Sequence, residues 1–258
     1  IGSYCEEQST LFHRDAFQGN PHTARILFIY TVFVVYAELH CLTHYSFLRG
    51  ASAPEELVGR AANCGYHALA ITDECSLAGV VKAHVAAKEL GLKLIVGSEF
   101  TLTEGIRLVA LAPSREAYGE LSELISRARR RSGKGEYRVH LRDVIFHLKR
   151  CLLILLPNDT DNQTVHLQQL ARRCKGRVWI GISRLLGNDE WRRFKHRYHM
   201  AQNLQVPMVA CGEVQMHSAK RKALHDVLTA IRLQTPVQQL GHRRLINSQQ
   251  HLRTLDTL

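Results

Sequence analysis

HALAITDECSLAGVVKAHVAAKELGLKLIVGSEF, residues 67–100, contains two short apolar runs that flank a helical pattern. The runs, 67–72 and 92–97, have the length and unbroken apolar character of parallel strands buried on both faces. Between them, Ser76 is placed to cap a helix that continues to Leu90 and that Gly91 ends. The stretch therefore predicts a strand, a helix and a second strand.

The alternation of predicted strands and helices continues toward both ends of the chain. Seven strands, each followed by a helix, predict an α/β barrel with functional groups on the loops after the strand ends. An open doubly wound sheet is the competing architecture, although no GxGxxG follows the first strand. The further strands are expected at 28–40, 106–112, 151–156, 177–182 and 206–210, and the further helices at 54–65, 114–125, 161–174, 189–204 and 218–233.

Size and charge fit a basic protein with a large core. The 258 residues are 45% hydrophobic, which suffices for one barrel or for two smaller domains. The 34 basic and 23 acidic residues give a formal charge of +11 and a pI near 9.6. Such a balance favours a phosphate-bearing partner such as DNA, and a solvated basic surface without a ligand is the alternative.

Cysteine usage and hydropathy indicate a soluble protein of a reducing cytoplasm. The seven cysteines are odd in number and form no CxxC pair, which argues against a disulfide framework or a zinc knuckle. The apolar run 26–36 is too short for a membrane helix, which needs roughly twenty residues.

Carboxylates and histidines gather after the predicted strands. Because the ends of barrel strands meet at one rim, four such ends provide the groups that zinc, manganese or iron would need for hydrolysis. The residues at these ends are Glu38 and His40, Asp73 and Glu74, Glu99, and Glu213 and His217.

Each of these residues also has a structural interpretation. His40 suits a histidine that hydrogen bonds hold at a strand end, and Glu99 suits a buried salt bridge. Asp73 and Glu74 precede a helix whose dipole they would complement. The HxH and DxH patterns of a strong metal motif are missing, so the residues alone leave these alternatives open.

A basic cluster ends the helix predicted from Ser114 and enters a glycine-containing loop. It is a candidate to hold a nucleic-acid backbone. Cations at a helix C-terminus also stabilise the helix dipole, which is the alternative. The cluster consists of Arg127, Arg129, Arg130, Arg131 and Lys134.

Long strings of the sequence resemble the bacterial C-family DNA polymerases of the polymerase III α-subunit type, and most of all their damage-induced, error-prone paralogue. The strings are YAELHCLTHYSFLRGASAPEELVGRAANCGYHALAITDECSLAGVVKAHVAAKELGLKLIVGSEFTL (36–102), RLVALAPSREAYGELSELISRARRR (107–131), CLLILLP (151–157) and VPMVACGEVQMHSAKRKALHDVLTAIRLQTP (206–236).

The resemblance implies a PHP domain, a distorted, TIM-like barrel of seven β/α strands, over 36–217. Residues 218–258 would begin the connection toward a polymerase palm that the chain is expected to lack. Residues 1–35 do not share the resemblance and are expected to be an extension outside the fold. The lack of resemblance in residues 1–35 favours a truncated copy with an altered N-terminal segment over a deliberately shortened polymerase or a partial gene product.

Carried over by position, the family's metal site is depleted in this sequence. Its two outright matches are His40 and Glu99, with Glu74 and Glu213 as carboxylate replacements. The other ligand positions hold Leu42, Arg49, Arg107 and Gln215.

Arg49 and Arg107 would repel a metal and are expected to pair with Glu74 and Glu99. The site is therefore predicted to be structural, with no catalytic residue and with residual zinc or manganese unexpected.

For an intact enzyme the resemblance implies a nucleotidyltransferase. Its activity would be DNA-directed DNA synthesis past lesions, with Mg²⁺ bound in the palm. The implied partners are primer-template DNA, the sliding clamp and damage-response accessory proteins. Two alternatives stay open for the chain itself, namely a stand-alone metal-dependent PHP phosphoesterase and a non-catalytic DNA-binding scaffold.

Overall fold

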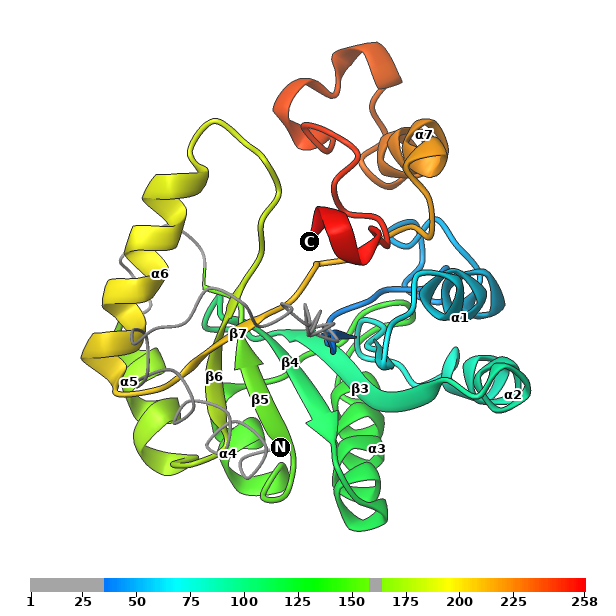
Figure 1. The fold of residues 1–258 in the computed structure, drawn as a ribbon. Helices are drawn as coiled ribbons and strands as arrows, with labels where there is room; N and C mark the ends of the chain where they lie inside the picture. The colour runs from blue at the N-terminus through cyan, green and yellow to red at the C-terminus, as the bar shows by residue number, and fades with distance from the viewer. Residues whose placement is uncertain (1–34, 158–163) are drawn as a thin grey trace, which may run out of the picture. The chain divides into compact units, whose positions relative to one another are not determined.

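Seven strands pair in the order in which they follow one another along the chain (Figure 1). The structure, a computed structural model, describes residues 35–157 and 164–258. The strands are β1 (Ala37–Glu38), β2 (Ala68–Ile71), β3 (Lys93–Thr101), β4 (Arg107–Ala112), β5 (Leu152–Leu155), β6 (Val178–Ile182) and β7 (Met208–Ala210).

The two outer strands of this sheet meet again just beyond their ends. Cys41 and Val214 form a parallel bridge. The amide of Leu42 donates to the carbonyl of Val214 at 2.8 Å, and the amide of Val214 donates to the carbonyl of His40 at 2.9 Å. The sheet thus curls into a nearly closed barrel, which confirms the predicted fold class over an open doubly wound sheet.

Strand β4 runs against its neighbours. It pairs antiparallel with both β3 and β5, whereas the remaining pairs are parallel. The prediction that a helix follows every strand is therefore wrong after β3. Only residues 102–106 join β3 to β4, and a parallel crossover needs about a dozen residues. Gly105 makes the tight turn with a φ of 82°.

Helices surround the barrel (Figure 1). The cap predicted at Ser114 is confirmed, since its side chain accepts from the amide of Ala117 at 3.3 Å. Gly91 ends its helix with a φ of 67°, as predicted. The helices are α1 (Pro54–Asn63), α2 (Val80–Leu90), α3 (Arg115–Arg130), α4 (Leu141–His147), α5 (Thr164–Arg173), α6 (Glu190–Leu204) and α7 (Lys222–Arg232), with short 3₁₀ turns at Ala219–Arg221, Val237–Gln239, Gly241–Arg243 and Leu255–Thr257.

Two helix predictions need correction. Helix α2 begins at Val80, because Ser76 caps only a local turn through the amide of Ala78 at 3.1 Å. Helix α4 was not expected, since its two turns are too short to give a clear period. Among the residues that the structure describes, no helix has the length and apolar character to cross a membrane.

The core has an inner and an outer layer, which explains why the strands are apolar without alternation. On β4, Val109 and Leu111 belong to the cluster shared with Ala70 and Ile154. The alternate residues of β4 instead join the larger cluster that includes buried side chains of α3 and α5. Both faces of the strand are buried, as expected for a barrel wall.

The C-terminal segment returns to the barrel, and Val34–Leu258 forms one compact unit. Met216 forms a bridge with His251, and the hydroxyl of Tyr66 donates to the carbonyl of Arg253 at 2.8 Å. Leu252 is fully buried in the cluster of α1. The division at residue 217 stays a prediction, and the predicted extension lies almost wholly outside the described residues.

Gly50 shapes the loop that follows β1, and its replacement provides a test of the fold. A Cβ there would lie 1.9 Å from the carbonyl oxygen of Thr43. We expect Gly50→Ala to lower the free energy of unfolding by about 3 kcal/mol in a urea titration, because the backbone must move. Gly59→Ala in α1 is the control. Its Cβ would have nothing within 4 Å, and it is expected to stabilise the helix by up to about 1 kcal/mol. Equal effects of the two changes would contradict the loop geometry.

Candidate functional site

The strand-end residues predicted as a vestigial metal site lie together at one mouth of the barrel. His40 follows β1, Glu74 follows β2, Glu99 lies within β3 and Glu213 follows β7. Nε2 of His40 is 2.7 Å from a carboxylate oxygen of Glu99, and both side chains are buried. Glu74 and Glu99 form a parallel bridge through their backbones.

Arg49 reaches this mouth from the loop after β1. Its Nη1 donates to Glu74 at 2.6 Å and to Glu99 at 2.7 Å. The predicted pairing of Arg49 with these two glutamates is therefore confirmed. The guanidinium supplies the positive charge between two carboxylates that a metal ion would otherwise supply.

Arg107 lies at the same mouth because β4 is antiparallel, so that β4 begins where the parallel strands end. Its Nη2 donates to Glu213, not to Glu74 or Glu99, and the predicted partner is wrong in this respect. The other oxygen of Glu213 accepts from Ser183 at 2.8 Å.

Every carboxylate oxygen of these three glutamates accepts a hydrogen bond from the protein. Both oxygens of Glu99 and both oxygens of Glu213 are engaged as described above. The remaining oxygen of Glu74 accepts from the hydroxyl of Tyr137 at 2.8 Å. The cluster is consequently a closed set of ion pairs and hydrogen bonds.

The electrostatics of the buried carboxylates agree with this arrangement. Burial alone raises the pKa of Glu99, but the hydrogen bond from His40 and the charges of Arg49 and Arg107 outweigh it, so the pKa lies well below its usual range. Burial also raises the pKa of Glu213, and Arg107 leads the charges that lower it below normal. Both groups are ionised at neutral pH and are balanced by arginines.

The residues at this mouth do not fit a metal cluster. Within 35–157 and 164–258, no group of three or more histidine, cysteine, aspartate or glutamate residues is arranged to hold an ion. Three buried nitrogens around this mouth have no hydrogen-bond partner among the described residues, namely Nδ1 of His40 and the Nε atoms of Arg107 and Arg197, and of these only the imidazole nitrogen could bind a cation. A single imidazole nitrogen next to two guanidinium groups is a poor site for a cation.

Two further strand-end carboxylates accept hydrogen bonds from backbone amides instead. Glu38 accepts from the amides of His40 at 2.9 Å and Gly212 at 2.8 Å. Asp73 accepts from the amide of Thr43 at 2.8 Å, so it fixes the loop after β1 and does not cap a helix. Burial raises the pKa of both Glu38 and Asp73.

Sequence reasoning missed the side chains that complete the cluster. Tyr137 comes from the segment before α4, and Ser183 follows β6. Arg197, on α6, is 3.9 Å from Glu213. Ser183 follows a predicted strand, which is a usable signal, whereas Tyr137 and Arg197 have no sequence pattern that indicates their position. His217 lies elsewhere, at 2.9 Å from Ser52.

The predicted nucleic-acid cluster is partly engaged within the domain. Arg127 pairs with Glu123 at 2.7 Å, and Arg131 pairs with Asp143 at 2.6 Å. Arg129 donates to several backbone carbonyls, including that of Cys75 at 3.1 Å. Arg130 and Lys134 are exposed. Contact of these residues with DNA stays a prediction.

Comparison with known proteins identifies the family. Residues 38–173, more than half of the chain, match the model of the PHP domain. The chain is 54% identical over 224 residues to the error-prone DNA polymerase of Saccharophagus degradans, covering 86% of this chain and 22% of that protein. It is 48% identical to the error-prone DNA polymerase of Pseudomonas aeruginosa, over 86% of this chain and 21% of that protein. The chain thus spans about a fifth of the length of these relatives.

Solved structures of low identity share the fold. A protein of Bifidobacterium adolescentis described as a metal-dependent phosphoesterase superposes with a TM-score of 0.52 at 18% identity, over 70% of this chain and 87% of the other. An amidohydrolase from Chromobacterium violaceum gives a TM-score of 0.50 at 16% identity, over the same shares. Together with the seven-stranded barrel, the family match shows that the chain belongs to the PHP domain family, in a form homologous to a region of the error-prone DNA polymerases.

Proposed function

We propose that this chain is the PHP domain of an error-prone DNA polymerase and that it acts there as a structural support. The observation that carries the proposal is the closed cluster of Glu74, Glu99 and Glu213, whose oxygens are all occupied by protein donors. Arg49 and Arg107 stand in the place where related barrels would need metal ligands.

The cluster supports the barrel as a metal centre would, by linking distant strands. Arg49 joins the loop after β1 to β2 and β3, and Arg107 joins β4 to the end of β7. Removing one partner of a buried ion pair leaves an uncompensated charge, which makes such links costly to break.

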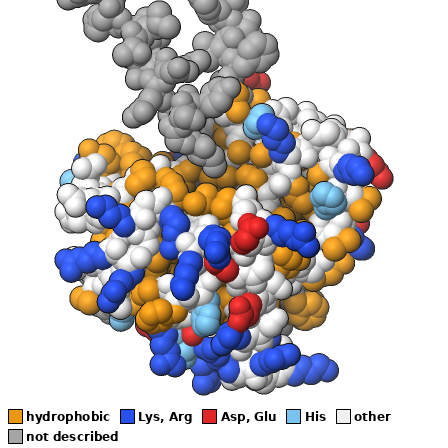
Figure 2. Space-filling view, turned by 90° about the horizontal axis from the view of Figure 1, so that it is seen from below, with side chains coloured by type: hydrophobic (Ala, Val, Ile, Leu, Met, Phe, Trp, Pro, Cys, Tyr) orange, Lys and Arg blue, Asp and Glu red, His pale blue; other side chains and the backbone are white. Residues whose placement is uncertain are grey.

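The basic surface is consistent with a position near DNA. Figure 2 shows a face of the domain on which Lys and Arg side chains outnumber Asp and Glu side chains. In the intact enzyme we expect DNA-directed synthesis past lesions, with Mg²⁺ held by palm carboxylates, and with primer-template DNA, the sliding clamp and damage-response proteins as partners in the cytoplasm. These expectations rest on the relatives that the chain resembles.

A metal-binding measurement tests the structural role against that of a phosphoesterase. The purified chain is incubated with Mn²⁺ or Zn²⁺, desalted and analysed for bound metal by mass spectrometry, and hydrolysis of bis-p-nitrophenyl phosphate is followed in parallel. We expect far less than one ion per chain and no turnover above that of Glu99→Ala. Stoichiometric metal with turnover that disappears in Glu99→Ala would establish a working phosphoesterase instead.

The contribution of the ion pairs to stability is tested with two arginine variants. Arg49→Met removes the arginine partner of Glu74 and Glu99 and leaves Glu99, which has no exposed surface, with its contact to His40. We expect its free energy of unfolding in urea to fall by about 3–5 kcal/mol. Arg127→Met, which removes an exposed pair on α3, is the matched control and is expected to change stability little. Similar losses in both variants would show that the buried cluster has no special role.

The lowered pKa of Glu99 predicts a specific response to acid. A carboxylate whose pKa is lower in the folded state contributes stability above its unfolded pKa of about 4.3, and this contribution is lost as the pH falls toward the folded pKa. Below about pH 4.3, Glu99→Gln should therefore lose stability less steeply than the unmodified protein in urea titrations. Glu89→Gln, at an exposed position of α2, should keep the original slope. An unchanged slope in Glu99→Gln would refute the pairing.

A further inference from the structure

Helix α6, with the sequence EWRRFKHRYHMAQNL, turns an aromatic face to solvent. Trp191, Phe194 and Tyr198 are spaced by three and four residues, so they lie on one side of the helix. Their exposed fractions are 66%, 37% and 43%. Among the residues of this helix only Ala201 is buried. The aromatic side chains therefore do not serve the core of the described domain.

The three rings form a ladder along α6. The centroids of Trp191 and Phe194 are 5.6 Å apart with ring planes at 11°, and those of Phe194 and Tyr198 are 6.4 Å apart at 22°. The ammonium of Lys195 lies 5.3 Å from the Trp191 ring centroid. Nearly parallel rings combined with adjacent cations are the features on which nucleic-acid bases stack.

Charge on this helix is strongly one-sided. Its only acidic residue is Glu190, and Oε1 of Glu190 accepts from the backbone amide of Leu186 at 3.0 Å. Cations spaced by three or four residues repel one another, and of the four cations of this helix Arg197 already lies 3.9 Å from a carboxylate, that of Glu213. The cations are Arg192, Arg193, Lys195 and Arg197.

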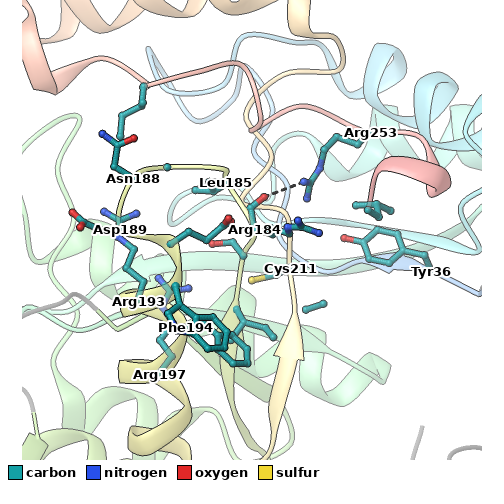
Figure 3. A pocket seen from close by; sticks show the side chains of 18 of the residues that line it. Tyr36, Arg184, Leu185, Asn188, Asp189, Arg193, Phe194, Arg197, Cys211 and Arg253 are labelled. Atoms are coloured by element: carbon teal, nitrogen blue, oxygen red, sulfur yellow. Dashed lines mark hydrogen bonds between the residues drawn. The ribbon is translucent and has the colours of Figure 1, made fainter.

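The ladder leads into a pocket of about 790 Å³ beside the strand-end cluster (Figure 3). Trp191 and Phe194 line one wall, and the end of β7 and the C-terminal segment line the others. Figure 3 shows Arg193, Arg197 and Phe194 on α6, with Arg253 opposite them. The four arginines of the lining, against Asp189 and Glu190, are Arg184, Arg193, Arg197 and Arg253.

Arg197 and Arg253 are held in place at this pocket. The Arg197 side chain is 11% exposed, and one of its nitrogens donates to the carbonyl of Gly181 at 3.1 Å. Its Nε is buried and has no hydrogen-bond partner among the described residues. Arg253 is buried and donates to the carbonyl of Arg184 at 2.9 Å. Fixed guanidinium groups are well suited to bind phosphate.

We propose that this pocket and the aromatic face of α6 bind single-stranded DNA. Bases stack on Trp191 and Phe194, and the backbone phosphates contact the arginines of the pocket and of α6. A single strand presents both its base faces and its charge, whereas the bases of a duplex are already stacked. Protein interfaces are also rich in aromatic residues and arginine, but they are depleted of lysine, and Lys195 lies over the Trp191 ring, so the observations favour a nucleic acid. The proposed site shares Arg197 with the strand-end cluster, where this residue lies 3.9 Å from Glu213, and it does not require the polymerase assignment.

Fluorescence anisotropy with a labelled thymidine oligonucleotide of about 12 nucleotides tests the proposal, since known sites span about 4–16 nucleotides. We expect binding at low salt that weakens linearly on logarithmic scales as salt rises. Trp191→Ala combined with Phe194→Ala should weaken binding at least about fivefold, because it removes the two rings on which bases stack. Trp191→Phe keeps a ring and should retain most of the affinity. Circular dichroism and thermal unfolding confirm that each variant is folded.

A control variant locates the site, and competing ligands identify what binds there. Lys88→Ala combined with Lys149→Ala removes two exposed cations that belong neither to the pocket nor to the basic cluster at the end of α3, and it should change the affinity little. If that pair abolishes binding while the aromatic variant does not, the proposal is overturned. It is also overturned if a duplex of the same sequence binds as tightly, if free thymidine monophosphate competes as well as the oligonucleotide does, or if no binding occurs at low salt.

Discussion

The buried carboxylate of Glu99 is the group on which the mouth of this barrel depends. It has no exposed surface, and its charge needs compensation because burial of an isolated carboxylate costs many kcal/mol. His40 and Arg49 provide that compensation from the end of β1 and from the loop that follows it. The loop that carries Arg49 is held by the hydrogen bond from the amide of Thr43 to Asp73 and by the close approach of Gly50 to Thr43.

The cluster lies at the strand ends and consists of ion pairs between glutamates and arginines. In a barrel, residues from distant parts of the chain meet at the strand ends, so ligands and their replacements occupy the same small space. Once an arginine takes a ligand position, its guanidinium satisfies the carboxylates and repels a cation. In this chain Arg49 pairs with Glu74 and Glu99, and Arg107 pairs with Glu213.

Sequence reasoning predicted the strands and helices well where local signals exist. The cap at Ser114 and the stop at Gly91 are local, and both were found as expected. The antiparallel direction of β4 was not predicted, because the apolar pattern of a strand carries no information about whether the strand runs parallel or antiparallel to its neighbours. That single reversal places Arg107 at the mouth of the barrel, where it pairs with Glu213, 106 residues away, and not with its predicted partners. Contacts over such separations have no local sequence signal.

The most direct test of the account is a crystal structure of this chain grown with Mn²⁺ and measured for anomalous scattering. We expect no anomalous peak among His40, Glu99 and Glu213, with the guanidinium of Arg49 lying between Glu74 and Glu99. A strong peak coordinated by these side chains, with Arg49 displaced from them, would contradict the central claim that ion pairs have replaced the metal.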